Sequence, residues 1–208
     1  MEVSFSLFFA ALVGFGHAFE ADHLIAVSNI ATKRQHLALA VKDGIFWGLG
    51  HTSTILLIGL LIIVGRLSVP ESMFSYLEAA VGVMLMVLGG YRLVQVWRFR
   101  EDTHHLADEG TKHHLAYGVG LVHGLAGSGA MVLLVMSEIS SSAVSMLYLL
   151  IFGLGSILGM LLAAGLLSLP VSKRVVGNLG LQLVLSVLSS LLCLGYGAWI
   201  LYENLTQV

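Results

Sequence analysis

The sequence predicts an all-α integral membrane protein with six transmembrane helices, arranged as a 3+3 inverted repeat with both termini outside the cytoplasm. Three observations predict this fold class: the composition, six long apolar stretches, and a similarity between the two halves of the chain. Of the 208 residues, 57% are hydrophobic and 11% are charged, whereas about a quarter of a soluble domain is charged. We therefore expect the apolar surface to face membrane lipid, and we expect no nucleic-acid partner.

The six predicted spans follow from length, because a helix needs about 20 apolar residues to cross a bilayer. The stretches of this length are 3–31, 44–66, 74–97, 115–136, 143–169 and 179–201. The first lacks the basic region and the small-residue cleavage site of a signal peptide, so it is expected to be a retained helix. The long polar connection, 98–114, divides the chain into a first three-helix repeat (1–97), a His-rich loop (98–114) and a second repeat (115–208).

Basic residues give the orientation of these spans. Cytoplasmic connections of membrane proteins carry an excess of Lys and Arg. The first, third and fifth connections, with the span ends beside them, hold Lys33, Arg34, Lys42, Arg92, Arg98, Arg100, Lys112, Lys173 and Arg174, and the opposite side holds Arg66. This distribution places the His-rich loop in the cytoplasm and both termini outside it.

The repeat is found by shifting the chain against itself by 105–106 positions. The shift aligns Gly14-Phe-Gly-His17 with Gly120-Leu-Val-His123, Gly48-Leu-Gly50-His51 with Gly153-Leu-Gly155-Ser156, and Gly90-Tyr91 with Gly195-Tyr196. Because each half has three spans, the second copy must insert upside down, as in many secondary transporters. The shift also pairs Asp22 with Ser128 and His23 with Gly129. The ligand-type residues are concentrated in the first half, which predicts a single asymmetric metal site.

The first span contains the polar cluster His17-Ala-Phe-Glu20-Ala-Asp22-His23. A charged side chain at the centre of a bilayer costs roughly 2.5–3.5 kcal/mol on insertion scales, and imidazole and carboxylate groups are ligands for divalent transition metals. On a straight helix, His17 lies about 140° from Asp22 and about 240° from His23. Either the ridge His17–Glu20–His23 faces the interior, or the helix unwinds near Gly14 and Gly16 so that His17, Asp22 and His23 converge.

Other histidines are further candidate ligands of the predicted metal site. His51 follows two glycines and precedes Thr52-Ser53-Thr54, whose hydroxyl groups could orient an imidazole. His123 is a further candidate ligand, as is Glu20, although a lone histidine can also serve as a hydrogen-bond bridge between helices. His104, His105, His113 and His114 belong to a loop that is either solvated or weakly metal-collecting. A proton relay through His and Asp without metal remains an alternative for the cluster.

The sequence does not favour an enzyme. It has no His-Glu-x-x-His motif and its one cysteine, Cys193, excludes a thiol pair. Cys193 lies in an apolar run and is expected to be a small buried hydrophobic residue.

The spacing of His17, Asp22 and His23 resembles the first-span signature of the nickel/cobalt transporter (NiCoT) superfamily, and Leu49-Gly50-His51-Thr52-Ser53 is similar to its second motif. Members of the usual type have eight spans, whereas six are predicted here. The stretch from His123 to Gly129 looks closer to the shorter branch related to the urease accessory membrane protein UreH. The clear match covers about a quarter of the chain.

The resemblance implies a transporter in the plasma (inner) membrane that carries Ni²⁺ or Co²⁺ as its substrate, with His17, Asp22, His23 and His51 as the binding positions. Uptake is expected; export, or delivery of nickel to urease or hydrogenase maturation proteins, is the alternative. Because metal binding requires neutral imidazole, transport is expected to weaken as the pH falls through the ordinary histidine range near about 6.5.

Overall fold

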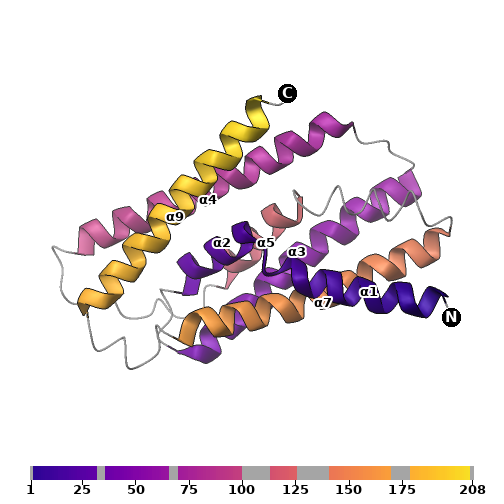
Figure 1. Cartoon of the computed structure of the whole chain (residues 1–208), viewed down its shortest axis with the longest axis horizontal. Coiled ribbons are helices and arrows are strands. Elements are labelled where there is room, and N and C mark those ends of the chain that lie inside the picture. Colours follow the sequence, from indigo (N-terminus) through magenta and orange to yellow (C-terminus); the bar gives the residue numbers. More distant parts are fainter. Residues whose placement is uncertain are drawn as a thin grey trace.

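The computed structural model describes residues 2–31, 36–65, 70–99, 113–125, 141–169 and 179–206. Over these residues the chain is helical, with seven helices (Figure 1). They are α1 (Glu2–His17), α2 (Ala21–Ala31), α3 (Leu37–Gly65), α4 (Glu71–Phe99), α5 (His114–Leu125), α7 (Ser142–Ser168) and α9 (Leu179–Thr206). Four of them, α3, α4, α7 and α9, are long and apolar enough to cross a membrane. The chain is therefore an all-helical, multi-pass membrane protein.

Several helices are longer than the apolar stretches that predicted them. Helix α3 begins at Leu37 rather than at 44, so that Lys42 and Asp43 are helical, and α9 continues to Thr206. The hydropathy of a segment marks the part that lies in lipid, whereas backbone hydrogen bonding continues beyond it. Helix α5 covers the first part of the predicted span 115–136, and residues 126–136 lie outside the described residues.

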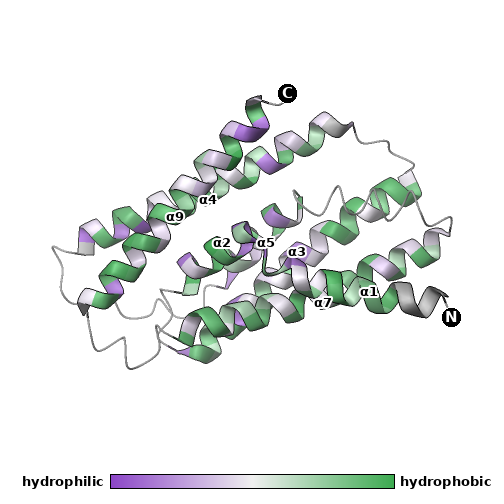
Figure 2. Ribbon diagram, viewed as in Figure 1, coloured by the Kyte–Doolittle hydropathy of each residue, from purple (hydrophilic) through white to green (hydrophobic). Residues whose placement is uncertain are grey.

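The helices pack as two groups joined by short helices. Helices α4 and α9 cross as a pair along one side, while α3 packs against α7 and α5, and α1 packs against α7 (Figure 1). The short helices α2 and α5 lie between the two groups, and α2 contacts α7, α9 and α4. Figure 2 shows apolar residues along most of α3 and α7, as expected of helices that face lipid and each other.

The first predicted span is broken, as the second of the two sequence-based alternatives expected. Helix α1 ends at His17 and α2 begins at Ala21. The connecting turn is closed by hydrogen bonds from Phe19 N to Gly16 O (2.9 Å) and from Glu20 N to His17 O (3.1 Å). The break lies near the predicted place, because α1 ends one residue after Gly16 and the Gly16 carbonyl accepts a hydrogen bond in the turn.

Small residues allow these helices to approach closely. A Cβ atom added at any of four glycines would meet a backbone carbonyl oxygen of the facing helix. The pairs are Gly14 with Phe152, Gly120 with Trp47, Gly155 with Ala11, and Gly50 with Tyr117. Close backbone approach at small residues is a main source of helix association in membranes. These contacts join α1 to α7 and α3 to α5, the helices that carry the histidines described below.

Polar contacts attach α2 to α9. Asn29 Nδ2 donates to Ser190 Oγ (3.4 Å), and the Cys193 thiol lies 3.5 Å from the carbonyl oxygen of Ile25. Cys193 is fully buried, which confirms the expectation of a small buried residue. The long helix α9 therefore holds the short helix α2, which carries His23, in place.

Two glycines in α5 test this packing. Gly120→Ala is expected to lower the free energy of unfolding by about 1–3 kcal/mol, because the new methyl group would meet the Trp47 carbonyl. Gly118→Ala is the matched control, since a Cβ there meets nothing within 4 Å. Alanine at 118 should be neutral or should stabilise the helix by up to about 1 kcal/mol. Thermal unfolding of the detergent-purified protein measures both, and equal effects would contradict the packing described here.

Candidate metal centre

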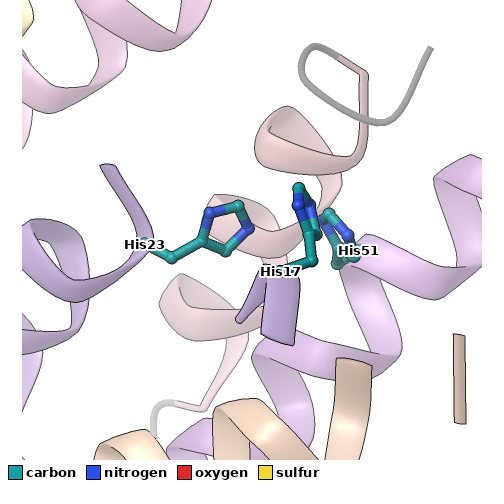
Figure 3. A group of neighbouring side chains, drawn as sticks. All are labelled: His17, His23 and His51. Carbon is teal, nitrogen blue, oxygen red and sulfur yellow. The ribbon is translucent and has the colours of Figure 1, made fainter. Parts of the chain in front are cut away.

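Three buried histidines from three helices point toward one another (Figure 3). His17 ends α1, His23 lies in the first turn of α2, and His51 lies in the middle of α3. The centroid of the His17 ring lies 4.6 Å from that of His23 and 5.2 Å from that of His51. One ring nitrogen from each residue lies within 4.8 Å of the others. The break in the first span makes this convergence sterically feasible.

Carboxylates hold two of these rings through Nδ1. Glu20 Oε1 lies 2.8 Å from His17 Nδ1, and Asp22 Oδ1 lies 3.0 Å from His23 Nδ1. An ionised carboxylate only accepts hydrogen bonds, so each Nδ1–H donates, and in the neutral imidazole Nε2 then carries the lone pair. This is the arrangement by which carboxylates orient metal-binding histidines. Both rings are therefore held through Nδ1 and present Nε2 on the side away from the carboxylate.

The cluster contains buried ring nitrogens without a hydrogen-bond partner. Among the described side chains these are Nε2 of His17, His23 and His123, and both nitrogens of His51. Leaving a buried polar atom unsatisfied costs about 1–3 kcal/mol. A cation that accepts nitrogen lone pairs would satisfy several of them at once.

Asp22 connects this group to a fourth histidine. Its Oδ2 atom lies 3.7 Å from Nε2 of His123, and Asp22, His23 and His123 form a second group whose ligand atoms lie within 4.8 Å of one another. His123 Nδ1 lies 3.3 Å from the carbonyl oxygen of Val119, one turn back in its own helix. His123 thus presents Nε2 to the cluster from α5, in the second half of the chain.

The structure brings together all the residues predicted as ligands, although not as one set. His17, His23 and His51 form one group, while Asp22 lies with His23 and His123. The Glu20 side chain is 49% exposed and contacts His17, so the predicted inward ridge is wrong and Glu20 orients an imidazole from the edge. That these residues bind a metal remains a prediction.

Sequence reasoning missed two neighbours of the cluster. The indole of Trp47 stacks on His23, with ring centroids 5.5 Å apart and an interplanar angle of 15°. Asp43 is buried and its Oδ1 lies 2.7 Å from His113 Nδ1. The sequence did contain a sign of both residues: Asp43, Trp47 and His51 are spaced four residues apart, which places them on one face of a helix.

His113 corrects the expectation of a solvated histidine loop. It is 5% exposed and packed against α3, because its pairing with Asp43 compensates for the loss of water. Its neighbour His114 is exposed, at the start of α5. His104 and His105 lie outside the described residues.

The fold and the cluster define the class: a multi-pass helical membrane protein with a buried histidine and carboxylate centre. The urease accessory protein UreH of Bacillus sp. (strain TB-90) is 36% identical to the chain over 169 residues, which cover 76% of this chain and 74% of that protein. The chain therefore belongs to the family of UreH. No protein-family model and no solved structure matches it.

This membership confirms the resemblance to the shorter, UreH-related branch, and the Bacillus relative is named as an accessory protein, not as an enzyme. Membership of the wider nickel/cobalt transporter superfamily remains a prediction.

Removal of each carboxylate tests how much it contributes to metal binding by orienting its histidine. Asp22→Ala is expected to lower the affinity for Ni²⁺ about 10–100-fold, because His23 Nδ1 loses its acceptor. Glu20→Ala should have a smaller effect, since Glu20 is half exposed and water can replace it at His17. Calorimetric titration of the detergent-purified protein with Ni²⁺ measures both affinities. An unchanged affinity in Asp22→Ala would contradict this role.

Proposed function

We propose that this protein transports Ni²⁺ or Co²⁺ across the membrane into the cytoplasm. The observation that carries the proposal is the convergence of unpartnered imidazole nitrogens from α1, α2, α3 and α5 inside a lipid-facing helical protein. The metal is the substrate, and His17, His23 and His51 are its nitrogen ligands. Asp22 supplies counter-charge and orients His23, and His123 is a further ligand.

The chemistry of the donors favours a borderline transition metal. Imidazole suits Ni²⁺, Cu²⁺ and Zn²⁺, whereas Ca²⁺ and Mg²⁺ prefer oxygen ligands. A thiolate ligand is not offered by Cys193, which lies against α2 through Ile25. Affinity alone would favour Cu²⁺, so selection of nickel or cobalt rests on the geometry of the cluster and on metal supply.

The broken first span suits a cation site. His17 lies in the last turn of α1, and the C-terminal end of a helix carries a partial negative charge and unpaired carbonyl groups. Broken helices at midplane are typical of ion and substrate sites in transporters, where non-helical backbone lines a cavity. The C-terminal end of α1 and the N-terminal end of α2 meet at this turn with opposite partial charges, so the turn at 18–20 favours the site by placing His17 beside His23.

The close helix contacts support the inverted repeat that alternating access would use. The contact of Gly14 with Phe152 corresponds to that of Gly120 with Trp47 when each residue is moved by the repeat offset of 105–106 positions. The contact of Gly155 with Ala11 corresponds in the same way to that of Gly50 with Tyr117. Two such pairs support a pseudo-twofold relation between the halves, around the histidine cluster.

An inward direction is favoured by energetics. A membrane potential contributes about 2.3 kcal/mol per elementary charge per 100 mV, so a dication is drawn strongly toward a negative cytoplasm. We propose the plasma membrane as the site of this transport, because such a potential is maintained there. Export by the same fold would need a coupling ion to drive the dication against the membrane potential.

The second candidate function is accessory. The name of the Bacillus relative, a urease accessory protein, supports delivery of nickel to the maturation proteins of a nickel enzyme. In that case the cluster would hold nickel for handover, and the protein would not move it across a bilayer alone.

Metal flux separates these functions. Full-length protein reconstituted in vesicles should move radiolabelled Ni²⁺ or Co²⁺, and His17→Ala, Asp22→Ala and His23→Ala should each reduce the initial rate at least about tenfold. His36→Ala is the matched control, because His36 is exposed and lies outside the cluster. Wild-type protein that binds Ni²⁺ but moves none would favour the accessory function. Full flux in all three variants would contradict the site.

Labelling of single cysteines tests the proposed orientation. In a Cys193→Ala background, Thr206→Cys should react with a membrane-impermeant maleimide added to intact cells, because the C-terminus lies outside. His36→Cys should react only after lysis. Both positions are exposed, so a reversed pattern would show the opposite orientation.

A further inference from the structure

A second buried imidazole and carboxylate pair lies on the same face of α3 as His51. Asp43 precedes His51 by eight residues, which corresponds to about 12 Å along the helix axis. It pairs with His113, the residue before α5, and the two side chains are 4% and 6% exposed respectively. The pair is separate from the four histidines of the central cluster.

The His113 ring is held in one orientation. Its Nδ1 lies 2.7 Å from Asp43 Oδ1, and Phe46 stacks on it with ring centroids 5.1 Å apart and an interplanar angle of 18°. Since the carboxylate accepts, Nδ1–H donates and Nε2 carries the lone pair. His113 Nε2 is buried and has no hydrogen-bond partner among the described residues. This is the same arrangement that Glu20 gives to His17 and Asp22 to His23.

Trp47 separates this pair from the central cluster. Asp43, Trp47 and His51 follow one another at intervals of four residues, and the Trp47 indole stacks on His23. Asp43 and Trp47 line one pocket, which lies between α2, α3 and α7. Polar and aromatic side chains therefore follow one another along α3 from His51 through Trp47 to Asp43.

The pair has no counterpart on the opposite side of the protein. The repeat offset relates Asp43 to Tyr148 and His113 to Leu7, which offer neither a carboxylate nor an imidazole. Lys33, Arg34 and Lys112 belong to the connections beside the pair, which the positive-inside rule assigns to the cytoplasm. The pair is thus a one-sided feature of the cytoplasmic end.

We propose that His113 and Asp43 form a second and weaker binding station for the transported divalent cation, between the central cluster and the cytoplasm. His113 Nε2 is the ligand, and Asp43 orients the ring and supplies counter-charge. The station is weaker because it offers fewer side-chain ligands than the central cluster. Passage along a pathway requires sites that bind strongly enough to admit an ion and weakly enough to release it. This inference rests on the proposed transport function.

The test measures, by calorimetry, the binding of Ni²⁺ to the full-length protein in detergent. A variant in which His17, His23, His51 and His123 are all replaced by alanine removes the imidazoles of the central cluster and should retain one weak site for Ni²⁺. Adding His113→Ala should abolish that site. Adding Asp43→Asn should weaken it about 10–100-fold, while an amide oxygen still accepts the Nδ1–H hydrogen bond and preserves the fold.

His114→Ala in the same background is the matched control, because His114 is the exposed neighbour of His113 and its loss should leave the site unchanged. The inference is overturned if the variant without the four cluster histidines binds no Ni²⁺, or if its residual binding survives both His113→Ala and Asp43→Asn. If His113→Ala fails to fold, Asp43→Asn alone decides.

Flux distinguishes failure of this inference from failure of the proposed function. Wild-type vesicles that move Ni²⁺, combined with no binding that depends on His113, would overturn the station and leave transport standing. Binding that depends on His113, in a protein that moves no metal, would overturn transport and show a second metal site in an accessory protein.

Discussion

The arrangement of the whole centre depends on one interaction: a carboxylate that accepts a hydrogen bond from Nδ1 of a buried imidazole. It occurs at His17, His23 and His113. In each case the carboxylate satisfies one nitrogen and leaves the other as a lone-pair donor inside a region with little water. The cost of such an atom is acceptable only where something binds it. The break after His17, the glycine contacts and the position of α2 all serve to bring these atoms together.

Much of the centre could be predicted from the sequence because polar residues inside apolar stretches are expensive and therefore informative. The cluster in the first span and the histidine after Gly50 needed no structural knowledge. Helical geometry showed that His17, Asp22 and His23 cannot share one face of a straight helix. That conflict predicted a distortion, and the chain does turn between His17 and Ala21.

The remaining features depend on tertiary contacts that no local pattern contains. The turn lies just after Gly16, while Gly14 remains in α1 in close contact with the Phe152 backbone of α7. The burial of His113 depends on Asp43, 70 positions away. The sequence identifies Asp22 as part of the site. Only the tertiary structure shows that one of its carboxylate oxygens faces His23 and the other faces His123 of α5.

The attachment of α2 links helix position to coordination. His23 belongs to α2, a helix of 11 residues that contacts α9 through Asn29 and through the Cys193 thiol. His17 and His51 belong to α1 and α3. A displacement of the α4 and α9 pair that carried α2 with it would change the distance between His23 and the two remaining imidazoles. In the proposed transporter, a shift of α2 relative to α1 and α3 would therefore add or remove one imidazole nitrogen at the metal, and would change the affinity of the site.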